Sequence, residues 1–397
     1  MKKIPVKTLQ PGFKFSEPVY IDGNNILVPA GLPIQKKDIA RLNSWGIQEI
    51  ETEGELIPPE PEAGTPEHDA SADGDSVSQN VKKAASMLSL TEVQENKGAY
   101  RTYIDLIGRL DAIFNDISNG LSVEARSIDN ISSQTLQAIR DQRDSFIGFI
   151  LGGEVSGHEM AKSSVNTAIL SALIAHELKL PHHKILHIIT GALLHDIGMF
   201  RLPPEILKKK GGLSEAELQR MKNHPLYSHK IASKELMYPK EVALIVLQHH
   251  ERWDGEGYPR QISNVAIDMG ARIVSVADAF EAMVSEKPYR NSMIGYQAIK
   301  NLLSDNSRRF DPDVLKAFIQ TIGIYPIGSI VCLNNGALTR VIEVHADAPL
   351  RPKVQILIDE FGKVFKQEEG EVLDLLAEKN IFIAKAVDPK EIAQKNA

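Results

Sequence analysis

Gly191-Ala-Leu-Leu-His195-Asp196-Ile-Gly198-Met199 begins the stretch, residues 191–259, around which this sequence is organised. His224-Pro225 follows, and the stretch closes with His249-His250-Glu251-Arg-Trp-Asp254-Gly255-Glu-Gly257-Tyr258-Pro259. Four of the chain's 12 histidines stand here in motif-like settings, one of them beside an aspartate. Neutral imidazoles and carboxylates are the side chains that bind divalent transition metals such as iron, manganese and zinc. The stretch therefore predicts a metal site.

Length and charge limit the classes of protein that the chain can belong to. Its 397 residues are too many for one typical domain, so we expect two or three. The net charge of −7 argues against a general DNA or RNA binder, because the phosphate backbone is met with an excess of Lys and Arg. A small phosphorylated ligand, bound by a few local cations, stays compatible with this charge.

The sequence also bears on location. No apolar run reaches the roughly 18 to 20 residues that span a bilayer. The first 15 residues, MKKIPVKTLQPGFKF, contain no apolar core of a signal peptide. Cys332 is the single cysteine, so no disulfide forms within the chain. We therefore expect a cytoplasmic protein without a membrane span.

Composition and pattern divide the chain into five segments. Residues 1–52 alternate short apolar runs with turns and predict a small α+β module. Residues 53–80 are rich in acids, Pro, Gly and Ser and predict a disordered acidic linker. Residues 81–150 show apolar side chains at helical spacing, and this helical lead-in either packs on the core or forms a dimer interface. The last two segments are a core, 151–322, and a C-terminal module, 323–397.

The core is helical in pattern throughout, with short polar breaks. Helices are expected near 158–178, 183–196, 214–222, 226–237, 239–250, 269–286, 294–305 and 311–321. Beyond the core the period changes from helix to strand. Apolar runs at 330–333 and 338–344 flank Asn334-Asn335-Gly336, which predicts a β-hairpin within a β-rich module.

Two acidic residues of the core follow apolar helical runs. His195-Asp196 comes after Ile188–Leu194, and Asp278 lies in Ala271–Phe280. Burying an unpaired carboxylate is costly, so each acid needs a partner. For His195-Asp196 alone, a shared metal and a simple hydrogen-bonded His–Asp pair are about equally good explanations. Two buried acids in one domain favour a shared cation.

His249 and His250 end the predicted helix 239–250 and precede a Gly-rich turn. Adjacent residues on a helix point about 100° apart. They therefore cannot easily serve one tetrahedral ion together, but they can reach two ions. This geometry indicates more than one metal.

Taken together, these motifs resemble the HD-GYP family, a branch of the HD phosphohydrolases, over residues 155 to 322. The matching motifs, in the family's order and approximate spacing, are His195-Asp196, His224-Pro225, His249-His250-Glu251, Asp254-Gly255-x-Gly257-Tyr258-Pro259, Ala277-Asp278 and Lys287-Pro288-Tyr289-Arg290. The resemblance implies a mainly α chain, with an all-helical HD-type core between the α+β module and the β-rich module. It also implies hydrolysis of cyclic di-GMP to pGpG or GMP, with two or three divalent metals, often iron or manganese.

The resemblance further implies roles for individual residues. His195 and Asp196 would be the catalytic pair. The metal ligands would be His195, Asp196, His224, His249, His250 and Asp278, with Glu159 added in the three-metal subset. Lys287 and Arg290 would hold the substrate phosphates and Tyr258 would line the site. Gly257-Tyr258-Pro259 would contact diguanylate cyclase (GGDEF) domains, and a homodimer is a further expectation.

Two positions depart from the family pattern. Ser164-Val165-Asn166 fixes the register of the first core helix, and the family's histidine there is Ser163 in this chain. A serine hydroxyl is a poor replacement for an imidazole ligand. Met199 stands where the family commonly has a lysine beside the reacting phosphate. His158 lies five residues before Ser163, which is 140° away around a helix, so we do not expect it to replace the lost ligand.

Two hypotheses about function follow. The first is an active cyclic di-GMP phosphodiesterase with a reduced metal centre, because most of the ligand set is present. The second is a catalytically degenerate protein that binds cyclic di-GMP or a partner protein, because Ser163 and Met199 weaken metal binding and charge stabilisation. A different HD activity, such as a nucleotidase, is disfavoured by the Gly257-Tyr258-Pro259 loop.

Overall fold

The fold comes from a computed structural model that describes residues 2–10, 12–20, 26–28, 34, 39, 42, 47, 49–57, 97–152, 157–207, 209, 211–285, 293–304, 308–365 and 369–388. Contacts between residues divide the chain into two compact units, Met1–Ala72 and Asp73–Ala397.

The N-terminal unit is built on short antiparallel strands. Its main sheet has the order β1-β5-β3-β4, and a second, two-stranded sheet pairs β2 with β6. The elements are β1 (Lys2–Pro5), η1 (Val6–Thr8), β2 (Lys14–Phe15), β3 (Val19–Tyr20), β4 (Ile26–Val28), β5 (Glu49–Thr52) and β6 (Leu56–Ile57). Because β6 is paired, this unit continues past residue 52, where we had predicted the acidic linker to begin. The remainder of that linker, 58–80, lies outside the described residues.

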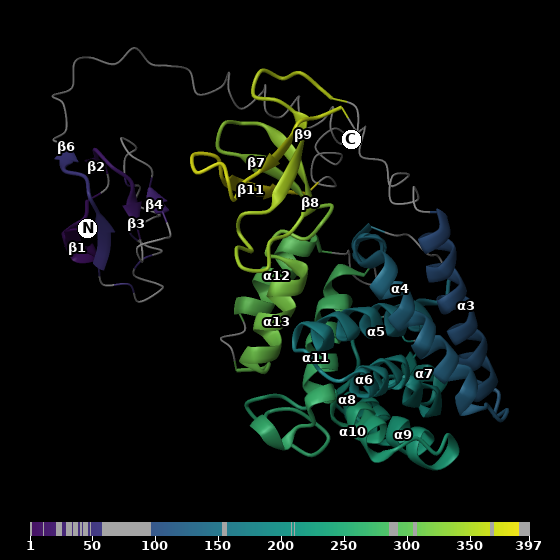
Figure 1. The fold of residues 1–397 in the computed structure, drawn as a ribbon. Coiled ribbons are helices and arrows are strands. Elements are labelled where there is room, and N and C mark those ends of the chain that lie inside the picture. Colours follow the sequence, from purple (N-terminus) through teal and green to yellow (C-terminus); the bar gives the residue numbers. More distant parts are fainter. Residues whose placement is uncertain are drawn as a thin grey trace. The chain divides into compact units, whose positions relative to one another are not determined.

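The second unit is mainly helical, which confirms the predicted fold class (Figure 1). Its helices are α3 (Lys97–Ser118), α4 (Ala125–Gly152), α5 (Glu159–Glu177), α6 (His182–Leu194), η3 (Ile197–Arg201), α7 (Pro204–Leu207), α8 (Glu215–Met221), α9 (His224–Lys230), η4 (Ile231–Glu235), α10 (Lys240–Gln248), η5 (Asn264–Ala266), α11 (Met269–Val284), α12 (Gly295–Ser304) and α13 (Pro312–Ile322). Within the described residues, no helix is both long and apolar enough to cross a bilayer.

The centre of this unit is α5, which is buried along most of its length. Its neighbours are α6 and α11 on the core side and α3 and α4 from the helical lead-in. Two buried polar contacts fix the lead-in to the core. Tyr103 donates a hydrogen bond from its hydroxyl to Asn166 Oδ1 at 2.7 Å, and Ser132 Oγ lies 2.9 Å from Thr190 Oγ1. Of the two alternatives for the lead-in, the structure therefore shows packing on the core.

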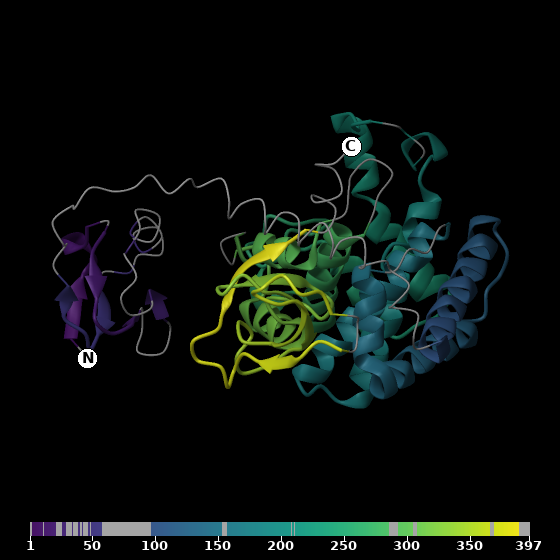
Figure 2. The same cartoon turned by 90° about the horizontal axis from the view of Figure 1, so that it is seen from above.

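A five-stranded antiparallel sheet follows α13, in the order β10-β9-β8-β7-β11. Its strands are the yellow-green and yellow arrows of Figure 2. Its strands are β7 (Ile330–Leu333), β8 (Leu338–Glu343), β9 (Lys353–Ile358), β10 (Val372–Asp374) and β11 (Ile383–Val387). The predicted hairpin is β7–β8. Its turn uses Gly336 at a φ of 88°, and Asn335 Oδ1 accepts a hydrogen bond from the Ala337 amide. Tyr296 of α12 stacks on Tyr325, with 5.0 Å between ring centres, and so joins the sheet to the helices.

Candidate metal centre

His195 and Asp196 lie where α6 ends and η3 begins. The apolar face of α6 carries His195 into the interior, where it is 1% exposed. Its Nε2 lies 3.5 Å from Asp196 Oδ2 and 3.6 Å from Asp278 Oδ1, which comes from α11. Two acids that are 82 positions apart in the sequence therefore meet at one imidazole, although both are half-buried rather than buried as we had expected.

His224 and His249 complete the inner part of the site. His224 Nε2 lies 3.2 Å from Asp196 Oδ1, and His249 Nε2 lies 3.8 Å from the same oxygen. The two Nε2 atoms are 3.3 Å apart. Because α9 begins at His224 and α10 ends just before His249, three helix ends converge on Asp196.

The three buried imidazoles are oriented in the same way. In each, Nδ1 lies close to the backbone carbonyl three residues earlier: 2.7 Å for His195 and Ala192, 2.8 Å for His224 and Met221, and 2.9 Å for His249 and Val246. With Nδ1 as donor, Nε2 becomes the lone-pair nitrogen and faces the site. This arrangement is the usual orientation of metal-binding histidines.

The residues present fit a metal ion. One ligand atom from each of Asp196, His224, His249 and His250 lies within 4.8 Å of the other three. The buried Nε2 of His195 has no hydrogen-bond partner within the described part of the chain. A set of imidazoles and carboxylates suits iron, manganese or zinc. A shared cation would satisfy the converging lone pairs and the buried carboxylate at once.

Electrostatics keep most of these ligands in a form that can bind metal. Burial and the neighbouring imidazoles lower the pKa of His249 well below its ordinary value, and they lower the pKa of His250 to about 3. Burial alone would lower the pKa of His195, but Asp196 and Asp278 outweigh it and raise that pKa to about 9. Burial disfavours the charged form of Asp196, yet His195 and His224 hold its pKa well below the ordinary value. A neutral imidazole and an ionised carboxylate are the forms that bind metals.

His249 and His250 follow α10, which ends at Gln248, so both lie in the turn after the helix. Their ring centres are 4.1 Å apart, and both residues belong to the same four-residue cluster. The two imidazoles can therefore contribute to one shared cluster, and the expectation that they reach two ions stays a prediction.

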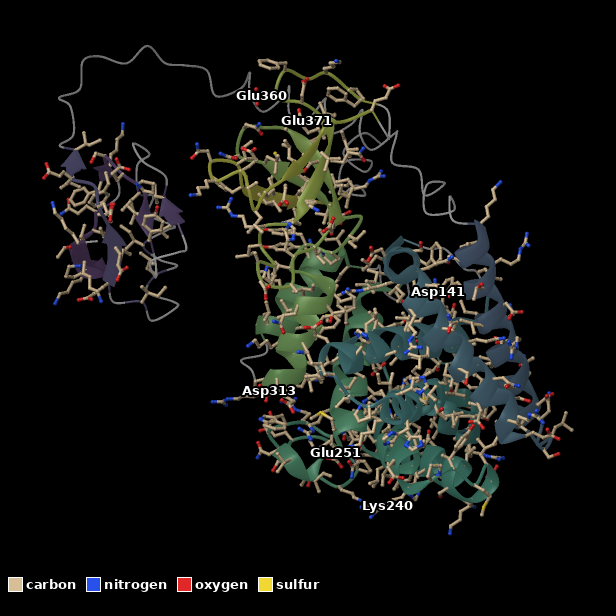
Figure 3. The ribbon with its side chains drawn as sticks, in the orientation of Figure 1. Asp141, Lys240, Glu251, Asp313, Glu360 and Glu371 are labelled. Carbon is tan, nitrogen blue, oxygen red and sulfur yellow. The ribbon has the colours of Figure 1, made fainter. Side chains whose placement is uncertain are left out.

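The loop after His250 holds an aromatic ring over the cluster. The Tyr258 ring lies 4.7 Å from that of His250, at 32°. Its amide donates to the His250 carbonyl at 3.1 Å. Gly257 allows this fold-back, because a Cβ there would lie 2.6 Å from both Glu251 Cα and the His250 carbonyl oxygen. Glu251, which is labelled in Figure 3, secures the far end of the loop. It accepts a hydrogen bond from the Arg260 amide at 2.6 Å.

Ser163 does not face an empty ligand position. Its hydroxyl donates to Glu281 Oε2 at 2.6 Å. Glu281 is 1% exposed, and its other oxygen accepts from Asn166 at 3.3 Å and from Ser285 at 2.5 Å. Serine at this position is therefore part of a buried hydrogen-bonded network between α5 and α11. Sequence reasoning missed Glu281, although a carboxylate one turn beyond Asp278 in an apolar helix was a usable signal.

The remaining predicted residues lie elsewhere. Glu159 is exposed at the start of α5, and His158 lies just before it with its Nδ1 2.8 Å from Asp111 Oδ2. His158 thus has a partner of its own, in agreement with the expectation that it does not replace a ligand. Met199 is half-buried in η3. Lys287 and Arg290 lie outside the described residues.

Ser228 is a second residue that the sequence did not reveal. Its hydroxyl donates to the His195 carbonyl at 2.7 Å and accepts from the Gly198 amide at 2.9 Å. Gly198 is needed for this contact, because a Cβ there would lie 2.5 Å from the Ser228 amide nitrogen. The pair joins α9 to η3, and so fixes His224 relative to Asp196.

The second unit is thus a helical domain with a cluster that could hold a metal ion, and comparison with known proteins identifies the family. Residues 154–314 match the model of the HD domain, and residues 330–395 match that of a KOW domain associated with HD domains. Residues 154–314 therefore belong to the HD domain family, and Gly257-Tyr258-Pro259 marks the HD-GYP type, as predicted.

Curated relatives lie in the same family. Cyclic di-GMP phosphodiesterase PdeB from Borreliella burgdorferi is 29% identical over 75% of this chain and 78% of its own length. Cyclic di-GMP phosphodiesterase PA4108 from Pseudomonas aeruginosa is 34% identical over 51% of this chain and 48% of its own length. Among solved structures, the HDG"Y"P protein Bd1817 from Bdellovibrio bacteriovorus aligns with 80% of this chain and 97% of its own, at 17% identity and a TM-score of 0.46.

Proposed function

We propose that this chain is a metal-dependent phosphodiesterase that hydrolyses cyclic di-GMP to pGpG or GMP in bacterial second-messenger signalling. The cluster of Asp196, His224, His249 and His250, with ligand atoms within 4.8 Å of one another, carries the proposal. The relatives named cyclic di-GMP phosphodiesterases support the predicted class of activity.

The proposed roles follow from the contacts. Asp196 lies between three imidazoles: its Oδ2 faces His195, which also lies near Asp278, and its Oδ1 faces His224 and His249. These residues and His250 would hold the metals. Bound divalent metals would polarise the phosphoryl oxygens and lower the pKa of an attacking water. Tyr258 would line the site from above His250.

The number and identity of the metals belong to the same proposal. We expect two ions rather than three, because Ser163 is hydrogen-bonded to Glu281 and Glu159 is exposed on the first turn of α5. The resemblance to the HD-GYP family favours iron or manganese, and the mixed imidazole and carboxylate ligands suit either ion. Glu159 as a third-metal ligand is therefore the weakest of the predicted assignments.

Partners and location stay predictions. A diguanylate cyclase domain would meet the Gly257-Tyr258-Pro259 loop through its exposed neighbours Glu256 and Arg260, since Gly257 itself is buried. A homodimer and a cytoplasmic location also remain predictions from the sequence.

The alternative function is a cyclic di-GMP receptor without turnover. Ser163 and Met199 favour it, because the first removes an imidazole ligand and the second a positive charge. Against it, Asp196, His224, His249 and His250 still form a cluster that could hold a metal ion, and relatives of the chain are named phosphodiesterases. The alternative is therefore not better supported.

A combined assay of metal content and hydrolysis tests the proposal. The purified chain, loaded in turn with iron, manganese, nickel and zinc, is given cyclic di-GMP, 3'3'-cyclic GMP-AMP or cyclic di-AMP. We expect about two metals per chain from the two-sided ligand set and fastest cleavage of cyclic di-GMP. Asp196→Asn should abolish both, whereas Asp313→Asn, at the exposed start of α13, should change neither (Figure 3). Tight binding of cyclic di-GMP with no cleavage under any metal would support the receptor instead.

A further inference from the structure

Glu281 is a buried carboxylate one turn beyond Asp278 on α11. It is 1% exposed, and its oxygens accept hydrogen bonds from Ser163 at 2.6 Å, from Ser285 at 2.5 Å and from Asn166 at 3.3 Å. Residues three apart on a helix are neighbours on one face. Because backbone hydrogen bonds fix adjacent turns of a helix relative to each other, whatever holds Glu281 also limits where Asp278 can lie.

Asn166 extends this contact to the helical lead-in. Its Nδ2 donates to Glu281, and its Oδ1 accepts a hydrogen bond from the Tyr103 hydroxyl of α3 at 2.7 Å. The Tyr103 ring packs against two rings of α4, with its centre 5.5 Å from that of Phe149 and 6.2 Å from that of Phe146. A continuous series of buried contacts therefore runs from α3 and α4 through α5 to α11. We call Tyr103, Asn166 and Glu281 the buried network.

The other end of α11 is also held by a polar contact. Asp268 is the N-cap of α11, and its amide donates to the side-chain oxygen of Gln248 at 2.7 Å. Gln248 is the residue before His249, so this contact joins α11 to the turn that carries two of the predicted ligands. Asp278 thus lies on a helix that is fixed near the cluster at one end and fixed to α3 and α5, through Glu281, at the other.

The position of α11 matters because Asp278 reaches the cluster from this helix. Asp278 Oδ1 lies 3.6 Å from His195 Nε2, and the Asp278 side chain is 21% exposed, against 1% for His195. Close packing therefore restrains the carboxylate less than it restrains the imidazole. A displacement of about 1 Å at a reacting group can lower a rate by roughly a hundredfold. Small movements of α11 would accordingly be felt in the chemistry.

Stability alone gives little reason for a carboxylate at position 281. Its neighbours on the buried side of α11 are apolar, among them Ile273, Val276 and Phe280. Burying a carboxylate carries a desolvation penalty, and apolar groups of similar size are often neutral or stabilising in its place. Buried polar networks do specify one arrangement of the helices that carry them, because their hydrogen bonds are satisfied only there. The buried network therefore suits a role in fixing how α11 lies against α5.

We propose that Tyr103, Asn166 and Glu281 position Asp278 in the metal centre, and that the lead-in helix α3 thereby sets the geometry of the site. The three are positioning residues, since they act through Asp278. The inference rests on the metal centre of the proposed function and adds to it a route by which a change at α3 alters the rate of hydrolysis.

The test uses the full chain loaded with cobalt(II), whose visible absorption depends on the geometry of its ligands. Tyr103→Phe removes one hydroxyl, and Glu281→Gln removes the charge but keeps the shape. Both should shift the cobalt spectrum toward that of Asp278→Asn, which lacks the carboxylate, while metal content stays that of the unmodified chain. In the manganese-loaded chain both should lower kcat for cyclic di-GMP about tenfold and leave KM unchanged.

Matched controls come from the same helix. Tyr100→Phe removes a hydroxyl of α3 outside the buried network, although the Tyr100 ring also lies against Phe149, at 5.5 Å. Leu110→Ala truncates a fully buried side chain and should cost more stability than Tyr103→Phe. Both controls should keep the cobalt spectrum and kcat. The double variant Tyr103→Phe/Glu281→Gln should differ no more than Glu281→Gln alone, because the two residues act through one route.

The cobalt spectra separate this inference from the proposed function. If Tyr103→Phe and Glu281→Gln keep the spectrum of the unmodified chain, the inference is wrong, whatever their activity. If Leu110→Ala shifts the spectrum as much as Tyr103→Phe does, lost stability explains the change and the inference also fails. If the two network variants shift the spectrum but the unmodified chain cleaves no cyclic dinucleotide, the proposed function fails and the inference stands. An unmodified chain that binds no metal overturns both.

Discussion

Ser163 gives one face of α5 a structural role, because the residue hydrogen-bonds a buried carboxylate of α11. Its hydroxyl donates to the buried Glu281, which also accepts from Asn166 and Ser285. A buried carboxylate needs several donors, since the loss of one leaves part of its charge unsatisfied. The serine thus stabilises the α5–α11 contact, where the family's histidine would bind metal.

We therefore predict that Ser163→Ala costs stability but leaves the metals in place. The loss of a donor to a buried carboxylate should reduce the free energy of unfolding by about 1–3 kcal/mol. Urea unfolding of the metal-loaded protein measures this. Ser304→Ala, which removes an exposed hydroxyl at the end of α12, is the control and should change the free energy by less than about 0.5 kcal/mol. A drop in metal content with Ser163→Ala would mean that the hydroxyl is a ligand after all.

Substitution of His224 tests whether the cluster binds metal. Its Nε2 lies 3.2 Å from Asp196 Oδ1 and 3.3 Å from His249 Nε2, so His224→Ala should remove at least one metal per chain and the hydrolysis with it. Metal analysis after gel filtration gives the stoichiometry directly. His229→Ala, on the same helix and outside the cluster, should retain the full complement. Equal metal content in the two variants would show that the cluster is not the metal site.

At the scale of elements, the loop from Glu251 to Arg260 depends on a glycine. A Cβ on Gly257 would meet backbone atoms of His250, Glu251 and Arg252, none of which can move like a flexible side chain. Gly257→Ala should therefore displace Tyr258 from His250, lower the unfolding free energy by about 1–3 kcal/mol and weaken cyclic di-GMP binding. Gly212→Ala, where no atom lies within 4 Å, is the control. Unchanged binding by Gly257→Ala would show that the position of Tyr258 is unimportant.

How far the sequence predicts these elements depends on how local their signals are. Apolar periodicity predicted the core helices to within a few residues, because the residues that face the core recur at helical spacing within each helix's own sequence. The His-Asp and His-His motifs likewise placed the cluster, since each ligand stands beside a helix end. The Ser163–Glu281 contact joins residues 118 apart, and no local pattern marks such a pair. The end of α10 at Gln248, two residues before the predicted end, was missed for another reason: periodicity does not fix a helix end to one residue.

On the scale of the whole molecule, the metals would join elements that the chain keeps apart. The ligands come from the ends of α6 and α10, from the start of α9 and from α11. Ions that bind only the folded state stabilise it by about 2.7 kcal/mol when present at a hundredfold over Kd. Removal of metal with EDTA, followed by dialysis, should therefore lower the Tm, and added manganese should restore it. His224→Ala should show a smaller shift, because it binds less metal at the outset. A Tm that EDTA does not change would exclude a stabilising metal.

The helical core needs α3 and α4 in order to fold, but it does not need unit 1. Tyr103, Leu106 and Leu110 of α3 are fully buried against the core. Each such side chain contributes roughly 1.5–3 kcal/mol, so these three together contribute about 4.5–9 kcal/mol, which is comparable to the 5–15 kcal/mol net stability of a typical domain. A chain that begins at residue 97 should keep its metals and its Tm, because unit 1 has a hydrophobic core of its own. A chain that begins at residue 157 lacks both helices and should not fold. Circular dichroism and metal analysis of the two chains distinguish these outcomes. If the shorter chain folded with its metals, α3 and α4 would be an accessory layer, and the Tyr103–Asn166 contact would contribute nothing essential to the metal centre.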